Sequence, residues 1–179
     1  MPEISIRPAI DTDIEPMMEI EHHYTSDHVW QMDFRQEGSE THISFRQIQL
    51  PRSVQVKYPR DYHSLADHWT QRDGLLIAEL AGEVIGYISI TRNELLKASW
   101  ATDLAVKRQH RRQGVASALV ISAQEWASQQ GGRRLILEMQ PKNYPAIQLA
   151  KKLGFELCGY NDHYFANHDI ALFFSKWLR

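Results

Sequence analysis

One stretch of the sequence decides the fold: Asp103-Leu104-Ala105-Val106-Lys107-Arg108-Gln109-His110-Arg111-Arg112-Gln113-Gly114-Val115-Ala116. Its first residues end a segment, 98–106, in which side chains alternate at period two, as in a β-strand. From residue 114 to about 129, apolar side chains recur every three to four residues, as on the buried face of a helix. The stretch therefore predicts a strand, a basic turn and a helix that starts at Gly114.

This arrangement favours the binding of a phosphate group. The first amides of a helix have no intrahelical acceptor, and together with the positive end of the helix dipole they attract an anion. Gly114 lets a diphosphate approach the backbone, and the small Ala116 keeps the first helical turn open. Four cations surround the same point, namely Lys107, Arg108, Arg111 and Arg112. A solvated turn before an ordinary helix is the alternative interpretation.

The sequence of the turn at residues 111–116 can be compared with the known phosphate-binding motifs. Neither the dinucleotide pattern G-x-G-x-x-G nor the P-loop pattern G-x-x-x-x-G-K-[ST] occurs. The pattern Arg111-x-x-Gly114-x-Ala116, after a strand that ends Leu-Ala-Val, resembles the acyl-coenzyme A motif of the GNAT superfamily of N-acetyltransferases. A second strand, turn and helix over residues 134–155, with Asn143 in its turn, is similar to the second coenzyme-side segment of that superfamily.

The resemblance covers residues 75–155 well and the N-terminal third loosely. It implies an N-acetyltransferase that uses acetyl-CoA as co-substrate and no metal. It also implies that the coenzyme contacts Leu104, Ala105, Val106, Arg111, Arg112, Gln113, Gly114, Val115, Ala116 and Asn143.

The composition is that of a soluble protein, and we expect one domain over residues 1–179. The net charge of −2 argues against a nucleic-acid partner, and no apolar run approaches the roughly 20 residues that span a bilayer. The single cysteine and an N-terminus without a signal pattern predict a cytoplasmic protein. The nine histidines lack metal-ligand spacing, so no metal site is expected. A homodimer is left open.

The periodicities predict an α/β fold: a mixed, mostly antiparallel sheet of six to seven strands with helices on both faces. The expected helices are 11–23, 61–72, 114–129 and one after Asn143. The expected strands are 4–9, 75–80, 83–91, 98–106, one starting at 134, 155–160 and 170–177, together with a hairpin of 44–50 and 53–58 around Pro51-Arg52.

Acetyl transfer to an amine first requires a proton acceptor. An alkylammonium has a pKa of about 10.4, so only about one part in 10³ is nucleophilic at pH 7. Glu138 is the leading candidate for this base and Asp103, on the neighbouring strand, is the second. A carboxylate paired with an arginine at the sheet edge is the structural alternative for each.

The reaction also requires a hydrogen-bond donor for the oxyanion that forms from the thioester carbonyl, and a proton for the departing thiolate. The resemblance implies that backbone amides of Leu104 to Val106 hold the oxyanion. The superfamily often carries a tyrosine where this chain has Ala150. Tyr160 or Tyr164 would then act as the general acid, or the thiolate leaves unaided, as a thiol pKa near 8.5 permits.

The acceptor is expected to be the primary amine of a small cationic molecule, acetylated directly in a ternary complex. Segments at 102–106, 137–140 and 169–174 are similar to segments of streptothricin acetyltransferases, which modify an amine of a polycationic antibiotic. Four acidic residues are candidate partners of such an amine: Asp27, Asp33, Glu37 and Glu40. Acetylation of a protein N-terminus or lysine, and a non-catalytic acyl-CoA-binding regulator, are the alternatives.

Overall fold

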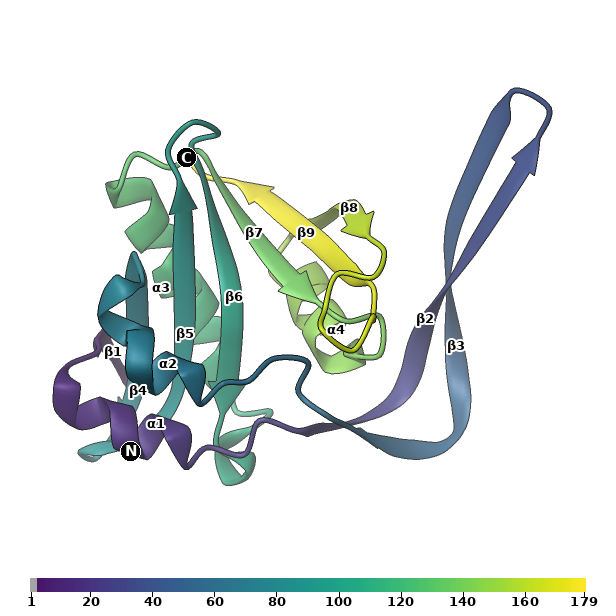
Figure 1. Cartoon of the computed structure of the whole chain (residues 1–179). Helices are drawn as coiled ribbons and strands as arrows, with labels where there is room; N and C mark the ends of the chain where they lie inside the picture. The colour runs from purple at the N-terminus through teal and green to yellow at the C-terminus, as the bar shows by residue number, and fades with distance from the viewer. Residues whose placement is uncertain (1–2) are drawn as a thin grey trace.

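The computed structural model describes residues 3–179 and contains a seven-stranded sheet, from which a long two-stranded hairpin projects (Figure 1). In chain order the elements are β1 (Ser5–Pro8), η1 (Asp11–Asp13), α1 (Ile14–Met18), β2 (Tyr24–Glu37), β3 (Glu40–Val56), α2 (Ser64–His68), η2 (Trp69–Gln71), β4 (Gly74–Leu80), β5 (Glu83–Asn93), β6 (Ala98–Val106), η3 (Arg108–His110), α3 (Val115–Gln129), β7 (Arg134–Met139), α4 (Tyr144–Lys152), β8 (Glu156–Asn161) and β9 (Ala171–Trp177).

The strand order in the sheet is β1-β4-β5-β6-β7-β9-β8. Strands β6 and β7 are parallel, and the crossover connection that joins them contains helix α3. The other neighbouring pairs are antiparallel. The prediction of a mixed, mostly antiparallel α/β sheet of six to seven strands is confirmed.

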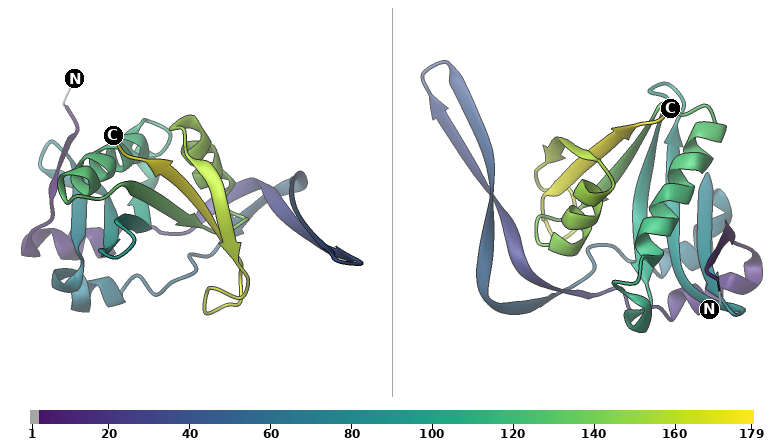
Figure 2. Two further views of the ribbon diagram at one scale, coloured as in Figure 1. Left: turned by 90° about the horizontal axis from the view of Figure 1, so that it is seen from above. Right: turned by 180° about the vertical axis from the view of Figure 1, so that it is seen from behind.

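The helices divide between the two faces of this sheet. Helices α1 and α2 lie over one face and α3 and α4 over the other (Figures 1 and 2). On β4, Leu76 and Ala78 belong to the core beneath α3, whereas Leu75 and Ile77 belong to the core beneath α1 and α2. Because successive side chains of a strand point to opposite faces, one strand supplies both cores.

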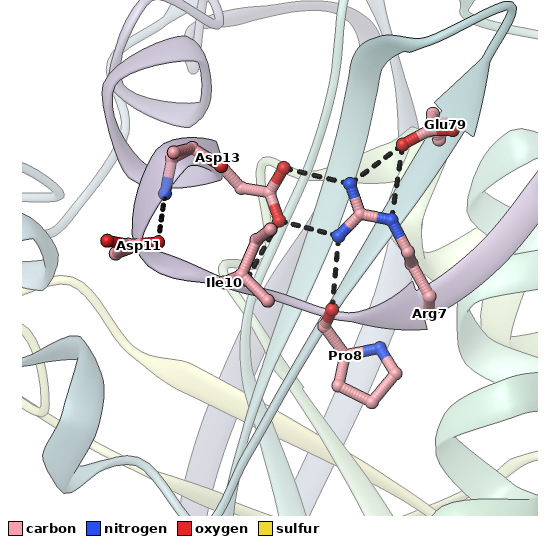
Figure 3. Close-up of polar contacts among 7 residues, drawn as sticks. Arg7, Pro8, Ile10, Asp11, Asp13 and Glu79 are labelled. Atoms are coloured by element: carbon pink, nitrogen blue, oxygen red, sulfur yellow. Dashed lines mark hydrogen bonds and ion pairs between the residues drawn. The ribbon is translucent and has the colours of Figure 1, made fainter.

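Arg7 joins the edge strand β1 to the neighbouring strand β4 and to the segment after β1 (Figure 3). The guanidinium of Arg7 donates to both carboxylate oxygens of Asp13, at 2.7 and 3.0 Å, and to Glu79 on β4 at 2.7 Å. The Arg7 hydrogen bonds hold the pKa of the Asp13 carboxyl below its usual value. This network fixes the start of the chain beside β4, at the edge of the sheet away from the hairpin.

The region before residue 58 differs from the sequence prediction. Strands β2 and β3 form one long hairpin that turns after Glu37 at Gly38, whose φ is +61°. The hairpin predicted around Pro51-Arg52 is therefore wrong, since Pro51 lies inside β3. The β2–β3 register shifts between Ser26 and His28, and this irregularity accommodates a proline that has no N–H to donate.

The first helix is shorter than predicted. It ends at Met18, whereas the apolar spacing predicts a helix to residue 23. Ile20 and His22 are buried beyond its end, and the imidazole of His22 is held by two hydrogen bonds described below. The apolar spacing was correct about burial, but tertiary contacts replace the last helical turns.

Candidate active site

Strands β6 and β7 are paired over only part of their length. Parallel pairing joins Ala98–Ala101 to Arg134–Leu137 and then stops. Beyond this point β6 continues beside β5 and β7 continues beside β9, so the two strands diverge (Figure 1). Thr102 is an extra residue in the β5–β6 ladder at the start of the divergence, and such bulges bend a strand.

A cavity of about 80 Å³ lies in this divergence. We call it the cleft. Its walls come from both strands, from the start of α4, from the segment before α2 and from the connection between β8 and β9. They include Leu104, Leu137, Glu138, Asn143, Arg60 and Phe165. The side chain of Asn143 accepts a hydrogen bond from the Ala146 amide at 3.1 Å and so caps α4. Asn143 therefore lines the cleft and also starts the helix beside it.

The start of α3 presents free amides at one end of β6. Gly114 precedes the helix with φ +88°, a conformation that glycine adopts without strain. The first helical hydrogen bond is donated by Ala118 to the carbonyl of Gly114 at 3.0 Å. The amides of residues 115–117 have no acceptor in the described chain, residues 3–179, so this 15-residue helix begins with unpaired donors of the kind that attract anions.

Strand β6 offers further amides towards the cleft. The Lys107 amide donates to the carbonyl of Ile85 on β5 at 2.8 Å. Since backbone groups alternate between the two edges of a strand, the amides of Leu104 and Val106 face away from β5, whereas that of Ala105 faces β5. Two of the three amides expected to hold an oxyanion therefore point to the side of the cleft.

Arg111 has a different role from the one expected. Its guanidinium donates to the carbonyl of Val106 at 2.9 Å, to that of His23 at 3.1 Å and to that of Glu21. Burial lowers the pKa of this guanidinium. Arg111 thus fastens the segment before β2 to the end of β6, and the expectation that it adds free charge to the turn is corrected. Arg112 is exposed, with φ +63°.

The two neighbouring arginines give a matched prediction. Arg111→Ala leaves three carbonyls without their donor, so we expect the free energy of unfolding to fall by about 2–4 kcal/mol. Arg112→Ala should leave stability unchanged and weaken acetyl-CoA binding in a salt-dependent way, because an exposed charge contributes little to folding. Urea titration and calorimetric titration at two salt concentrations measure both quantities. Equal stability of the two variants would contradict the structural role of Arg111.

A larger cavity, of about 500 Å³, lies on the α1 and α2 side of the sheet. We call it the acceptor cavity; its lining includes Tyr62, Arg72, Tyr87, Asp103, Tyr164 and Phe165. Pro59, Arg60 and Phe165 line both this cavity and the cleft. The two cavities are therefore adjacent and share these three residues as a common boundary, beside the divergence of β6 and β7.

Asp103 is the buried carboxylate of the acceptor cavity. It is 7% exposed and accepts hydrogen bonds from the hydroxyl of Tyr58 and, at 3.0 Å, from that of Thr102. Burial and the neighbouring Asp103 raise the pKa of the Tyr58 hydroxyl well above its usual value. The Tyr58 hydroxyl therefore keeps its proton, donates a hydrogen bond to the carboxylate and holds Asp103 in place.

Glu138 stands on the other diverging strand and is held by two side chains. Its carboxylate forms an ion pair with Arg60 and accepts a hydrogen bond from the Tyr164 hydroxyl at 3.0 Å. Arg60 also donates to the carbonyl of Thr102 at 3.0 Å, and its guanidinium lies over the ring of Phe165. Arg60 therefore joins the two strands across the junction of the cavities, and Glu138 has the arginine partner that the structural alternative describes.

Behind the acceptor cavity lies a buried histidine. The Nδ1 of His22 is 2.6 Å from the carbonyl of Ile20, and its Nε2 is 2.6 Å from the hydroxyl of Tyr87. A carbonyl only accepts, so Nδ1 carries the proton and Nε2 accepts from Tyr87. The ring of His22 also stacks on that of Tyr62, with centroids 3.6 Å apart. Burial lowers the pKa of this imidazole to about 4.

This histidine makes stability depend on pH. Its pKa is about 4 in the folded protein against 6.5 ordinarily, so between these values the unfolded chain binds more protons. The contribution of neutral His22 to the free energy of unfolding should therefore be fully present above pH 6.5. The free energy of unfolding should fall by up to about 3 kcal/mol as the pH drops towards 4. Urea titrations across this range should show a shallower dependence in His22→Gln and an unchanged one in the exposed control His68→Gln. An identical pH dependence in His22→Gln would contradict this account.

Several candidate residues lie outside both cavities. Tyr160 packs against Phe45 of the hairpin, edge to face, and Ala150 is buried in α4. The four acidic residues proposed as substrate partners, Asp27, Asp33, Glu37 and Glu40, lie on the β2–β3 hairpin and line neither cavity. Tyr164 is the tyrosine, of the two considered as general acid, that reaches the acceptor cavity.

The sequence analysis missed the segment that closes the site. Tyr58, Arg60 and Tyr62 all face the buried carboxylates or His22, yet they belong to a stretch without periodicity. The only signal is compositional: a run of aromatic and charged residues around Pro59 contains no apolar side chain that would bury it in the core.

Two general features of the described residues bear on the chemistry. Within residues 3–179, no cluster of three or more His, Cys, Asp or Glu side chains is placed to hold a metal ion. In the same range, none of the helices has both the length and the apolar character needed to cross a membrane.

The sequence is similar to that of known proteins. Residues 41–155 match the family model described as Acetyltransferase (GNAT) family. An N-alpha-acetyltransferase of Sulfurisphaera tokodaii is 30% identical over 142 residues, which cover 72% of this chain and 81% of that protein.

Two solved structures share the fold over nearly the whole chain. Nourseothricin acetyltransferase superposes with a TM-score of 0.82 and 22% identity, covering 98% of this chain and 99% of that one. A Bacillus anthracis protein assigned as a streptothricin acetyltransferase, solved in complex with acetyl coenzyme A, superposes with a TM-score of 0.78 and 20% identity over 98% of this chain and 100% of that one. The chain belongs to the GNAT acetyltransferase family and is an acetyl-CoA-dependent N-acetyltransferase.

Proposed function

We propose that the chain transfers the acetyl group of acetyl-CoA to a primary amine of a small cationic molecule, directly within a ternary complex. The adjacency of the cleft and the acceptor cavity, which share Pro59, Arg60 and Phe165, carries this proposal. We place the acetyl thioester in the cleft and the amine in the larger cavity, so that they react across this shared boundary without a covalent acetyl-enzyme.

The coenzyme side uses backbone groups. The diphosphate binds the free amides at the start of α3, with Gly114 leaving room and Arg112 adding charge. The amides of Leu104 and Val106 point to the side of the cleft, where the thioester carbonyl would lie. They stabilise the negative charge that develops on that oxygen, and loss of one such donor typically lowers the rate by about 10²–10³.

The acceptor side uses Asp103. Its carboxylate lines the acceptor cavity, binds the ammonium group and accepts one of its protons. The geometry favours Asp103 over Glu138 as this base, the reverse of the order inferred from sequence. Glu138 is paired with Arg60, and a neighbouring cation makes a carboxylate a poorer proton acceptor.

The transfer itself then exchanges two bonds. The neutral amine attacks the thioester carbon, a C–N bond forms, and the C–S bond breaks as the tetrahedral intermediate collapses. We assign protonation of the thiolate to Tyr164, whose hydroxyl lies 3.0 Å from Glu138 and which lines the acceptor cavity. The nitrogen then loses its extra proton to solvent, from which the Tyr164 phenolate is reprotonated, and Asp103 releases to solvent the proton that it accepted from the ammonium group.

The relatives described above name two kinds of acceptor. The two superposed structures are described as acetyltransferases of nourseothricin and streptothricin, which favours a small molecule. The Sulfurisphaera tokodaii relative is described as an N-alpha-acetyltransferase, which makes a protein N-terminus the second candidate.

Release of free thiol from acetyl-CoA tests the proposal. The panel should contain diamines, amino sugars, free amino acids and peptides with an unblocked N-terminus, each measured at several concentrations. We expect turnover with small amines and a lower kcat/KM with peptides. A preference for peptides would establish the second candidate, and tight acetyl-CoA binding without turnover of any amine would establish a regulator.

A further inference from the structure

Among residues 3–179, Arg72 is an arginine of the acceptor cavity whose guanidinium has no protein partner. It follows η2, lines the cavity and is only partly exposed. Among residues 3–179 its guanidinium has no hydrogen bond or ion pair, whereas the other lining arginine, Arg60, is bound to Glu138 and to the Thr102 carbonyl. An arginine that faces a cavity without a carboxylate partner is available to a ligand.

Arg72 shares its cavity with the carboxylate of Asp103. Both act on the hydroxyl of Tyr87, because Asp103 raises the pKa of that group and Arg72 lowers it. The two charges nevertheless form no ion pair in the described chain. Asp103 is held in place by the hydroxyls of Tyr58 and Thr102. Opposite charges that are not paired with each other, Arg72 and Asp103, therefore line one cavity together with Tyr87.

A molecule that fits this space carries opposite charges in the complementary order. Its ammonium group faces Asp103, and an anionic group faces Arg72. A guanidinium matches a carboxylate by two parallel N–H···O bonds, which fix orientation as well as supply affinity. A volume of about 500 Å³ lies within the range of small-molecule sites, so a compact metabolite fits.

We infer that the acceptor is an amino acid or a closely similar molecule, with a carboxylate near the amine that is acetylated, and that Arg72 binds this carboxylate. This inference rests on the proposed transfer to a primary amine, and it replaces the cationic acceptor named there with a zwitterionic one, whose ammonium group faces Asp103 and whose carboxylate faces Arg72. It also separates the two acceptor candidates. At a peptide N-terminus the corresponding carboxylate is an uncharged amide, which cannot pair with Arg72.

Matched acceptors test the inference. For several amino acids, kcat/KM is compared among the free acid, its amide and the amine left by removal of the carboxyl group. With the wild-type protein we expect the free acid to be preferred by about 10–100-fold. Ethanolamine phosphate, compared with β-alanine, separates a phosphate from a carboxylate as the bound anion.

Variants assign the preference to Arg72. Arg72→Gln should raise KM for the free acid by about 10–100-fold and leave the kinetics of the amide unchanged. Arg72→Lys keeps the positive charge but loses the planar guanidinium that donates two parallel hydrogen bonds, so it should retain part of the preference for the free acid. Arg52→Gln is the matched control, because Arg52 is exposed on β3 and lines neither cavity. Acetyl-CoA affinity and the thermal midpoint confirm that each variant is folded, and Arg72→Lys serves if Arg72→Gln unfolds.

The outcomes are distinct. A wild-type protein that acetylates acid and amide equally overturns the inference and leaves the proposed function standing. A preference for the acid that survives in Arg72→Gln overturns the role of Arg72, and a preference for ethanolamine phosphate overturns the carboxylate. Absence of thiol release with every amine overturns the proposed function itself.

Discussion

Asp103→Asn is expected to lower kcat at pH 7 by about 10²–10⁴, with the affinity for acetyl-CoA nearly unchanged. The substitution keeps the shape of the side chain and an oxygen that can accept from Tyr58, but it removes the basicity. Without a proton acceptor the reaction depends on the small neutral fraction of the amine, about one part in 10³ at pH 7.

Two further variants isolate this role. Glu138→Gln should have a smaller effect on kcat, because Glu138 already forms an ion pair with Arg60 and organises the junction of the cavities. Tyr58→Phe removes a hydrogen-bond donor to Asp103 and leaves the carboxylate, so it tests positioning alone. Steady-state kinetics with one amine and calorimetric titration with acetyl-CoA provide the numbers for all three variants.

The pH profile supplies a second readout. The Asp103→Asn variant should regain rate at high pH, where solvent deprotonates the amine, and no structural defect would produce such a recovery. Wild-type turnover of Asp103→Asn at pH 7 would exclude the assignment, and a larger loss in Glu138→Gln would restore the order inferred from sequence. Full activity of both variants would leave positioning and oxyanion stabilisation as the site's contributions.

Gly114→Glu is expected to weaken acetyl-CoA binding by about 100-fold or more. No atom lies within 4 Å of a Cβ added at Gly114, so the free protein has room for the side chain. The new carboxylate, however, stands beside the amides that receive the diphosphate and repels it. Its φ of +88° strains any residue other than glycine, which costs about 1–2 kcal/mol of stability.

Gly131 provides the control for that strain. It follows the other end of α3, with φ +77° and likewise no atom within 4 Å of an added Cβ. Gly131→Glu should therefore lose similar stability in urea titration and keep wild-type affinity for acetyl-CoA in calorimetric titration. Unchanged affinity in Gly114→Glu would remove the start of α3 from the coenzyme site.

The region from β4 to α4 could be read from the sequence because its signals are local. Alternation along residues 75–106 reports which side chains face each core, and Gly114 reports a backbone conformation that other residues avoid. The N-terminal region could not be read in this way. In β3 the residues of 40–55 are exposed or only partly buried, so no core face imposes a period. Pro51-Arg52 resembles a turn, whereas the chain turns at Gly38.

The same distinction applies to the site. The free amides and the dipole at the start of α3, on which the proposed coenzyme site depends, could be predicted from the sequence because they follow from where a helix starts, whatever surrounds it. The sequence also placed Asp103 and Glu138 on adjacent strands. The partners of these side chains, however, depend on tertiary packing. Arg60 reaches Glu138 from 78 residues away, and Arg111 binds carbonyls 88 and 90 residues away, so their partners depend on how distant segments pack. Charge alone specifies that an arginine will find an acceptor, whereas the packed chain specifies which one.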